Sequence, residues 1–485
     1  MAAVANDMLL KMRRVHAAPW IVVLALAGTA TQPAAAPAGD TASLRTGQVM
    51  EHLVCGADSE RSYALYLPSA FRPDRRWPVM ILMDPRGRAL VPLELFRPAA
   101  EDLGYVLVSS YDTASDGPRE PNILALRALL PEIEARFSPA PGRIYFTGFS
   151  GTARFAWDVG ALMGKKLAGL IGVGAGRPPA YDPPSPATFA FFGIAGTDDF
   201  NYEELRVLNR TLDEGSQPHR FAAFDGPHAW PPGPVCTAAL EWMELQAMRT
   251  GLRPHSDSLL GRLHQAAVIR ARELDGDPLM AAEAWTAIAE DFAGLLDVTA
   301  ESARAEQLSA SQDVRTARRR EQELLLARDR YQQRFTTWLD QVDSAPNPPV
   351  TARSLRTLEI ARLQRRRDSK DSLDAAAARR ILAHVFSYTA FYETRRYLAE
   401  KRPLPALAML AVADAIQPDG VQVCLGRARA HALSGQQKKG LQALECLLRS
   451  GRVSAAFIAR DPGLAPLRRG EAYEDLMGRW PAPSP

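Results

Sequence analysis

The sequence predicts an α/β domain with a mostly parallel sheet, followed by a region that is all helical. Between residues 48 and 250, strand-like apolar segments alternate with helical ones, as in parallel sheets that carry helices on both faces. After Gly251 the strand signals disappear, and Ala, Leu and Arg recur at helical spacing. A chain of 485 residues is long enough for two or three domains of this kind.

The charge balance excludes one class of partner. The chain has 58 Lys and Arg residues against 55 Asp and Glu residues, a net charge of +3. A nucleic-acid-binding protein usually shows a strong basic excess. We therefore expect no nucleic-acid partner.

Residues 1–38 are predicted to be a signal peptide. Three basic residues precede the apolar stretch 17–30, and small residues suited to cleavage follow it. Cleavage after Ala38 is favoured, with Ala30 as the second choice, and Met12 is an alternative start. We expect a periplasmic or secreted protein without a stable membrane span after cleavage. An uncleaved anchor is the alternative, because an apolar stretch of about 14 residues is short for a membrane span but not impossible.

The α/β domain is predicted over residues 45–252. Its strands are expected at 62–67, 78–83, 105–109, 143–147, 169–174, 188–195 and 220–224. Its helices are expected at 93–103, 122–137, 151–163, 202–214 and 235–250. Functional residues of such sheets gather at the carboxyl ends of the strands.

Two further regions are predicted to be helical. Residues 256–345 should contain a helical hairpin, 258–274 with 278–292, and then one long charged helix over about 299–342. Residues 350–485 form the third predicted region. In the predicted long helix, the cluster Arg318-Arg319-Arg320 lies among glutamates and is expected to be a solvated helix face.

A 34-residue periodicity occurs in the last region. Small or apolar residues occupy the packing positions of the second helix in two successive repeats: Ala406, Leu410, Ala413, then Gly440, Leu444, Leu447. Pro418 closes the first unit, and Gly435 occupies a turn between helices. Residues 375–476 therefore resemble degenerate tetratricopeptide repeats, which stack into binding surfaces. This resemblance implies a protein partner.

Four cysteines are divided between the two halves of the chain. Cys55 and Cys236 lie in the α/β domain, and Cys424 and Cys446 lie in the last helical region. In an exported protein each pair could form one disulfide. Four buried thiols are the alternative, since cysteine also serves as a small core residue. The spacing matches no zinc site.

Three polar residues follow successive predicted strands in the order Ser150, Asp199, His228. A serine hydroxyl becomes a nucleophile when a base takes its proton, and a carboxylate orients that base. The chain order Ser–Asp–His is typical of an α/β-hydrolase triad. The sequence therefore predicts Ser150 as nucleophile, His228 as base and Asp199 as the acid. Asp198 is the alternative acid, since either carboxylate could instead cap the following helix.

The residues around Ser150 suit a sharp turn from strand to helix. Gly148 relieves crowding before the turn, and the N–H of Gly151 is a natural oxyanion donor. Thr152 stands where a second glycine is usual and is expected to crowd the neighbouring strand.

A second oxyanion donor is expected from the loop 84–88. Pro85 has no N–H, so Arg86 or Gly87 must supply it. Arg86 is the predicted donor. An ion pair between Asp84 and Arg86 is the alternative interpretation of this loop.

These motifs together resemble the α/β-hydrolase superfamily over residues 48–250. The nearest resemblance is to secreted esterases of the polyhydroxybutyrate depolymerase and feruloyl esterase type. The matching segments are Gly-Phe-Ser-Gly-Thr at 148–152, Gly-Thr-Asp-Asp at 196–199 and Pro-His-Ala-Trp-Pro at 227–231. The resemblance implies an acyl-enzyme mechanism with no metal or organic cofactor. The chain departs from the family pattern at Thr152, at Asp84-Pro85 and at Pro227.

Two function classes follow from this pattern. The first is an exported serine hydrolase, a carboxylesterase acting on a small-molecule or polymer ester; a peptidase or acyltransferase would use the same triad. The second is an inactive hydrolase fold that binds partners through its helical repeats. The three departures from the family pattern motivate the second class.

Overall fold

The computed structural model describes residues 44–178, 181, 187–345, 348 and 352–480. The predicted signal peptide, 1–38, lies outside the described residues. The chain divides into two compact units, Met1–Val314 and Arg315–Pro485. The finer predicted division into 45–252, 256–345 and 350–485 stays a prediction.

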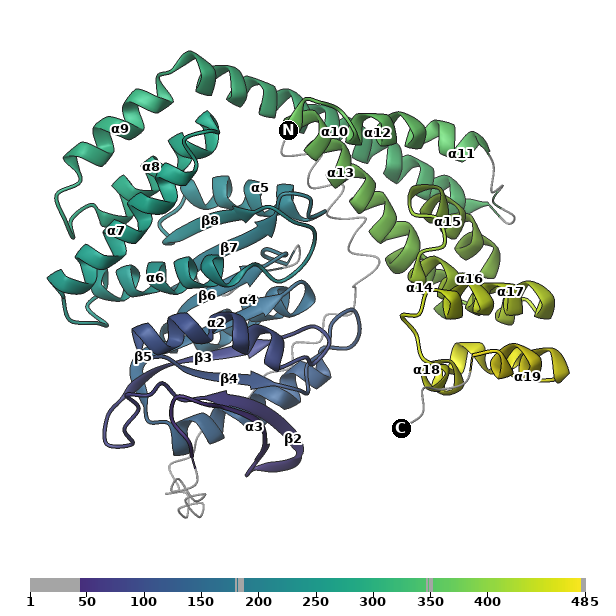
Figure 1. Ribbon diagram of the computed structural model, residues 1–485, viewed down its shortest axis with the longest axis horizontal. Helices are drawn as coiled ribbons and strands as arrows, with labels where there is room; N and C mark the ends of the chain where they lie inside the picture. The colour runs from purple at the N-terminus through teal and green to yellow at the C-terminus, as the bar shows by residue number, and fades with distance from the viewer. Residues whose placement is uncertain (1–43, 179–180, 182–186, 346–347, 349–351, 481–485) are drawn as a thin grey trace. The chain divides into compact units, whose positions relative to one another are not determined.

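The first unit contains an eight-stranded sheet in the order β1-β2-β4-β3-β5-β6-β7-β8 (Figure 1). The strands are β1 (Val49–Cys55), β2 (Asp58–Tyr66), β3 (Trp77–Met83), β4 (Val106–Ser110), β5 (Pro139–Phe149), β6 (Leu167–Val173), β7 (Ala190–Gly196) and β8 (His219–Phe224). The pairings β1–β2 and β2–β4 are antiparallel, and all the others are parallel. The predicted fold class is therefore confirmed.

Helices cover both faces of this sheet. They are α2 (Leu90–Leu103), α3 (Glu120–Arg136), α4 (Gly151–Met163), α5 (Tyr202–Asp213) and α6 (Gly233–Arg249). Alternate residues of β3 enter two different cores: Met80 and Leu82 pack with α2 and α6, whereas Val79 and Ile81 pack with α3, α4 and α5. Every residue of β3 is buried, as expected for a parallel strand with helices on both faces.

The sequence did not predict the edge strand β1. Its residues Val-Met-Glu-His-Leu-Val-Cys are mostly exposed or half-buried, so they carry no continuous apolar run. Antiparallel pairing with β2 makes this segment a strand. Tertiary pairing therefore outweighs weak local preference at this edge.

The prediction of one long helix over 299–342 is wrong, because this segment forms two helices. The helices after the sheet are α7 (Asp257–Glu273), α8 (Pro278–Phe292), α9 (Thr299–Ser309) and α10 (Gln312–Ser344). At the break, the Ser311 N–H donates to the Leu308 carbonyl at 3.0 Å, and its Oγ accepts from the Val314 N–H at 3.3 Å. A serine that caps the next helix in this way ends the preceding one.

Helices α7, α8 and α9 share the apolar core on the α2–α6 side of the sheet. Leu260, Trp285 and Phe292 belong to that core. Arg206 of α5 also pairs with Glu283 of α8 at 2.9 Å. The helical hairpin that the sequence predicts is thus packed on the α/β domain.

The second unit is all helical. After α10 it contains α11 (Ala352–Thr357), α12 (Ile360–Arg367), α13 (Ser372–Ser387), α14 (Glu393–Ala399), α15 (Pro403–Ile416), α16 (Val421–Leu433), α17 (Gln437–Arg449), α18 (Ala455–Arg460) and α19 (Glu471–Gly478). The apolar residues predicted from the 34-residue period are buried: Ala406, Leu410, Ala413, Leu444 and Leu447. Gly435 forms the turn between α16 and α17 with φ +68°. The assignment to tetratricopeptide repeats stays a prediction.

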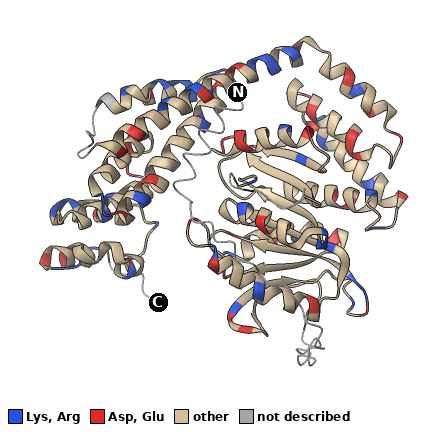
Figure 2. Ribbon diagram, turned by 180° about the vertical axis from the view of Figure 1, so that it is seen from behind, with Lys and Arg blue, Asp and Glu red and all other residues tan. Residues whose placement is uncertain are grey.

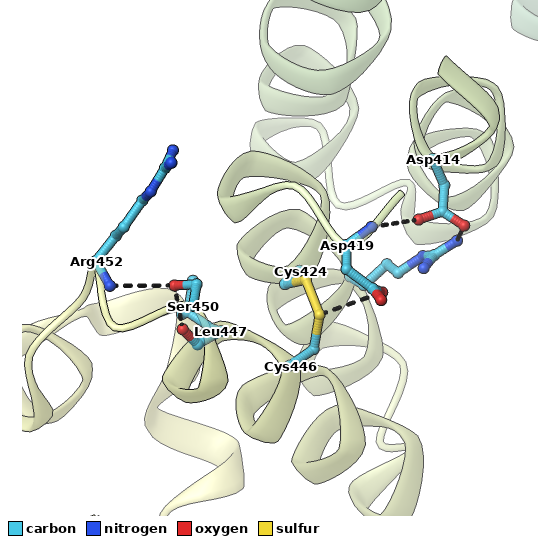
Figure 3. The surroundings of a disulfide bond; sticks show 8 residues. Asp414, Asp419, Cys424, Cys446, Leu447, Ser450 and Arg452 are labelled. Carbon is cyan, nitrogen blue, oxygen red and sulfur yellow. Dashed lines mark hydrogen bonds and ion pairs between the residues drawn. A yellow bond between two sulfur atoms is a disulfide. The ribbon is translucent and has the colours of Figure 1, made fainter. Parts of the chain in front are cut away.

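Two of the four cysteines form a disulfide, and the other two are buried free thiols. Cys424 of α16 and Cys446 of α17 form a disulfide, which joins neighbouring helices (Figure 3). Cys55 and Cys236 are buried free thiols. Burial raises the pKa of the Cys55 thiol to about 12, so this thiol is protonated and unreactive at neutral pH.

Charges of both signs are interspersed along the described ribbon of each unit (Figure 2). This distribution agrees with the net charge of +3. Among the described residues, no helix combines the length and the apolar character that crossing a bilayer requires.

Candidate active site

The candidate site is built at the carboxyl ends of β5, β7 and β8. Ser150 lies between the end of β5 and the start of α4, with φ +55°. Positive φ is strained for a residue other than glycine and often marks functional turns. The Ser150 N–H donates to the Val173 carbonyl of β6 at 2.8 Å, which holds the turn against the sheet. The predicted sharp turn is therefore present.

Neighbouring atoms lie so close to this turn that two of its positions require glycine. A Cβ on Gly148 would lie 2.5 Å from the backbone carbon of Thr152. A Cβ on Gly151 would lie 2.4 Å from the Cβ of Ser115. Real Cβ atoms do not approach other atoms so closely, so neither position accepts a larger residue without rearrangement.

Thr152 does not crowd the neighbouring strand, contrary to the sequence expectation. Its side chain is fully buried. Its Oγ1 lies 2.6 Å from the carbonyl of Met83 at the end of β3 and accepts from the Phe149 N–H at 3.0 Å. The hydroxyl therefore ties the serine turn to the adjacent strand.

Replacing Thr152 with valine is expected to lower the free energy of unfolding by about 1–3 kcal/mol, because both backbone groups lose a buried partner. Urea denaturation of the full chain measures this loss. Thr152→Ser, which keeps the hydroxyl, is the matched control and should retain most of the stability. A valine variant as stable as the unmodified protein would show that the hydroxyl bonds contribute nothing.

The three predicted residues Ser150, Asp199 and His228 are brought together. The His228 Nε2 lies 3.0 Å from the Ser150 Oγ, and the His228 Nδ1 lies 2.8 Å from the Asp199 Oδ2. An ionised carboxylate only accepts, so Nδ1 carries the proton and Nε2 accepts from the serine hydroxyl. The result is a continuous hydrogen-bonded chain from the hydroxyl to the carboxylate.

The Asp199 side chain contacts His228. The Asp199 side chain is fully buried, and its second oxygen accepts from the Asn201 N–H at 2.8 Å. Asp199 therefore holds the imidazole with one oxygen and the start of α5 with the other. The Asp198 N–H donates to the Gly226 carbonyl at 2.9 Å, which ties the acid loop to the histidine loop through the backbone.

Two aromatic residues that were not predicted from the sequence contact the imidazole. The ring centroids of Phe149 and Phe200 lie 4.6 Å and 4.3 Å from that of His228. Each phenylalanine is adjacent in sequence to a predicted site residue, Phe149 to Ser150 and Phe200 to Asp199. That adjacency is the only sequence signal that could have identified them. A Cβ on Gly174 would also lie 2.9 Å from the His228 Cε1, so the imidazole is closely packed.

The predicted oxyanion donors differ in availability. Gly151 is the first residue of α4, and the first N–H of a helix has no partner within that helix. The Arg86 N–H, in contrast, donates to the Asp84 Oδ1 at 2.8 Å. The Gly87 N–H donates to the Asp84 carbonyl at 3.1 Å. Arg86 is thus not the open donor that the sequence suggested, and an oxyanion would have to share its N–H with a carboxylate.

Asp84 makes more contacts than the sequence predicted. Its side chain is fully buried and pairs with Arg88, not with Arg86 as the alternative interpretation supposed. It also accepts from the Trp230 Nε1–H at 2.8 Å. Burial raises the pKa of the Asp84 carboxyl. Hydrogen bonds from Arg88, Trp230 and the backbone together lower this pKa by more than burial raises it, so the pKa lies below its usual range. Asp84 is therefore ionised at neutral pH.

No family model and no curated protein sequence matches the chain. Solved structures similar to it include a mutant feruloyl esterase module from Clostridium thermocellum complexed with sinapinate, at 14% identity, covering 40% of this chain and 85% of that chain, with a TM-score of 0.33. An S-formylglutathione hydrolase from Staphylococcus aureus is similar at 13% identity, covering 38% of this chain and 92% of that chain, with a TM-score of 0.32. A ferulic acid esterase is similar at 16% identity, covering 42% and 97%, with a TM-score of 0.32. At these TM-scores the similarities do not decide an activity.

Proposed function

We propose that this protein is a serine hydrolase that cleaves carboxylic esters through an acyl-enzyme. The observation that carries the proposal is the unbroken chain of hydrogen bonds from Ser150 through His228 to Asp199, at 3.0 Å and 2.8 Å. Nucleophile, base and orienting acid within hydrogen-bond reach are the geometric signature of nucleophilic catalysis.

In the proposed acylation step, the Ser150 Oγ attacks the ester carbonyl carbon while its proton passes to the His228 Nε2. Asp199 then faces a positively charged imidazolium through Nδ1–H and stabilises it. The imidazolium gives its proton to the departing alcohol, which leaves an acyl group on Ser150. Water, deprotonated by His228, attacks this acyl group, and the imidazolium returns the proton to the Ser150 Oγ as its bond to the acyl carbon breaks and the acid is released.

The oxyanion formed in each step needs N–H donors. Gly151 is the proposed first donor, because its N–H lies directly after the nucleophile at the start of a helix. Arg86 is the proposed second donor, with its N–H shared between the oxyanion and the Asp84 carboxylate. This sharing would weaken the second interaction.

Labelling with a fluorophosphonate tests the proposal. An activated Ser150 would attack the phosphorus, its proton would pass to His228, and fluoride would leave, so that the adduct stays on the serine oxygen. We expect mass spectrometry of the full chain to locate one adduct on Ser150. A folded protein that stays unlabelled at saturating probe would overturn the proposal.

A second candidate function is binding by an inactive hydrolase fold. The specific observation in its favour is the Asp84 carboxylate on the Arg86 N–H, which places negative charge beside a proposed oxyanion donor. Under this alternative, the helical second unit would recruit a protein partner. Absence of labelling together with an intact fold would favour it.

A peptidase or acyltransferase would use the same three residues, and the acceptor in the second step would distinguish them. Export is part of the proposal and rests on the sequence of residues 1–38. A panel of ester and peptide substrates follows a positive labelling result.

A further inference from the structure

Five N–H donors converge on the carboxylate of Asp84. Oδ1 accepts from the Arg86 N–H at 2.8 Å, the Arg88 N–H at 3.3 Å and the Arg88 Nε at 3.0 Å. Oδ2 accepts from the Arg88 Nη2 and from the Trp230 Nε1, each at 2.8 Å. A carboxylate offers about four acceptor positions, so this side chain uses its full capacity.

These bonds connect two loops that are distant in sequence. Asp84 follows β3, whereas Trp230 lies two residues beyond His228 in the loop after β8. The backbone of the Asp84 loop is itself fixed, since the Thr113 Oγ1 donates to the Asp84 carbonyl at 2.6 Å and the Ser115 N–H donates to the Pro85 carbonyl at 3.0 Å. Asp84 is thus a firm anchor for Trp230.

The indole of Trp230 extends this anchor toward the imidazole. Its ring centroid lies 5.6 Å from that of Phe149, and Phe149 lies 4.6 Å from His228. Movement of Trp230 would therefore disturb both the chain next to His228 and an aromatic ring that packs on it. A shift of about 1 Å in a reacting group can cost about 100-fold in rate.

We propose that Asp84 is a positioning residue of this site, which holds the His228 loop in register with Ser150 through the hydrogen bond from Trp230. The proposal rests on the proposed hydrolase function. It assigns Asp84 no contact with the substrate. Besides its bond to the Arg86 N–H, Asp84 acts on the rate through Trp230 and the loop that carries the base.

The variant Asp84→Asn tests this role with almost no change of volume. An amide has one accepting oxygen, and its NH₂ group would meet the N–H of Trp230 or of Arg88 with no lone pair to offer. We expect kcat for p-nitrophenyl butyrate to fall about 10- to 100-fold, with KM within about threefold, since misplacement of the base affects the chemical step and not binding.

The variant Trp230→Phe removes the same hydrogen bond from its other end and keeps an aromatic ring. We expect a similar loss of kcat. The double variant Asp84→Asn/Trp230→Phe should be no slower than the slower single variant, because both changes break one interaction. Losses that multiply would show that the two residues act independently and would overturn the proposal.

Trp242→Phe is the matched control. The Trp242 Nε1 also donates to a carboxylate, that of Asp291, at 2.8 Å, but Trp242 packs against Phe192 and has no part in the candidate site. This variant loses the same kind of bond elsewhere in the unit. It should keep the kcat of the unmodified protein, and an equal loss there would mean that Asp84 acts only through general stability.

Hydrogen exchange of residues 225–232 in a Ser150→Ala background separates this proposal from the hydrolase function. Asp84→Asn should speed exchange in this loop even where no turnover is measured. If the chain that keeps Ser150 shows no turnover and Asp84→Asn still speeds exchange in this loop, the anchor is upheld and the hydrolase function alone is overturned. Unchanged exchange, or a kcat equal to or above that of the unmodified chain, would overturn the positioning role.

Discussion

Replacing Ser150 with alanine is expected to lower kcat for an activated ester about 10⁶-fold, to the level left by the rest of the site. The reason is the geometry at the end of β5, where the Ser150 hydroxyl lies 3.0 Å from the only ring nitrogen of His228 that is free to accept its proton. Hydrolysis of p-nitrophenyl butyrate, measured with and without the variant, checks the result. Fluorophosphonate labelling should disappear in the same variant.

The fold provides the control for this experiment. Alanine removes one oxygen and leaves the backbone bond from residue 150 to the Val173 carbonyl in place. Circular dichroism and thermal unfolding should therefore match those of the unmodified chain. Turnover that persists in the alanine variant would mean that Ser150 is not the nucleophile.

The second large effect is expected for Asp199→Asn, with a fall in kcat of about 10⁴-fold. The Asp199 Oδ2 accepts from the His228 Nδ1–H at 2.8 Å. An amide NH₂ at that position would favour the tautomer that carries its proton on Nε2, and this nitrogen could then no longer accept from Ser150. Steady-state kinetics on the same ester measures the loss.

Asp198→Asn is the matched control, since it makes the same replacement of a carboxylate oxygen by an NH₂ group at the neighbouring residue. We expect its kcat to stay within about threefold of the unmodified protein, because the bond from Asp198 to the histidine loop comes from its backbone N–H, which the substitution keeps. If Asp198→Asn abolished turnover while Asp199→Asn kept it, the assignment of the acid would be reversed.

The strands and the candidate triad were predictable because their signals are local. The central strands are continuous apolar runs, and Ser150, Asp199 and His228 each follow one of them. Parallel strands bring their carboxyl ends to one edge of the sheet, so chain order was enough to place the three residues together. Gly148 and Gly151 were predictable for the same reason, since the turn itself requires them.

Other features depend on contacts that no local pattern records. The edge strand β1 exists through pairing with β2, and the break between α9 and α10 depends on one serine cap. Thr152 was expected to crowd a strand, yet it bonds to that strand. A hydroxyl in a tight space is harmful or stabilising according to the acceptors around it.

By itself, the sequence determined the α/β class, the following helical region and the order of nucleophile, acid and base, because apolar periodicity and strand ends are properties of short segments. Only the tertiary structure decided which of two aspartates meets His228, that the Arg86 N–H is held by Asp84, and that the disulfide joins Cys424 and Cys446. It also decided that Asp84 meets Trp230, 146 residues away in the chain. Hydrogen bonds act over about 3 Å, and only folding brings such distant residues within that range.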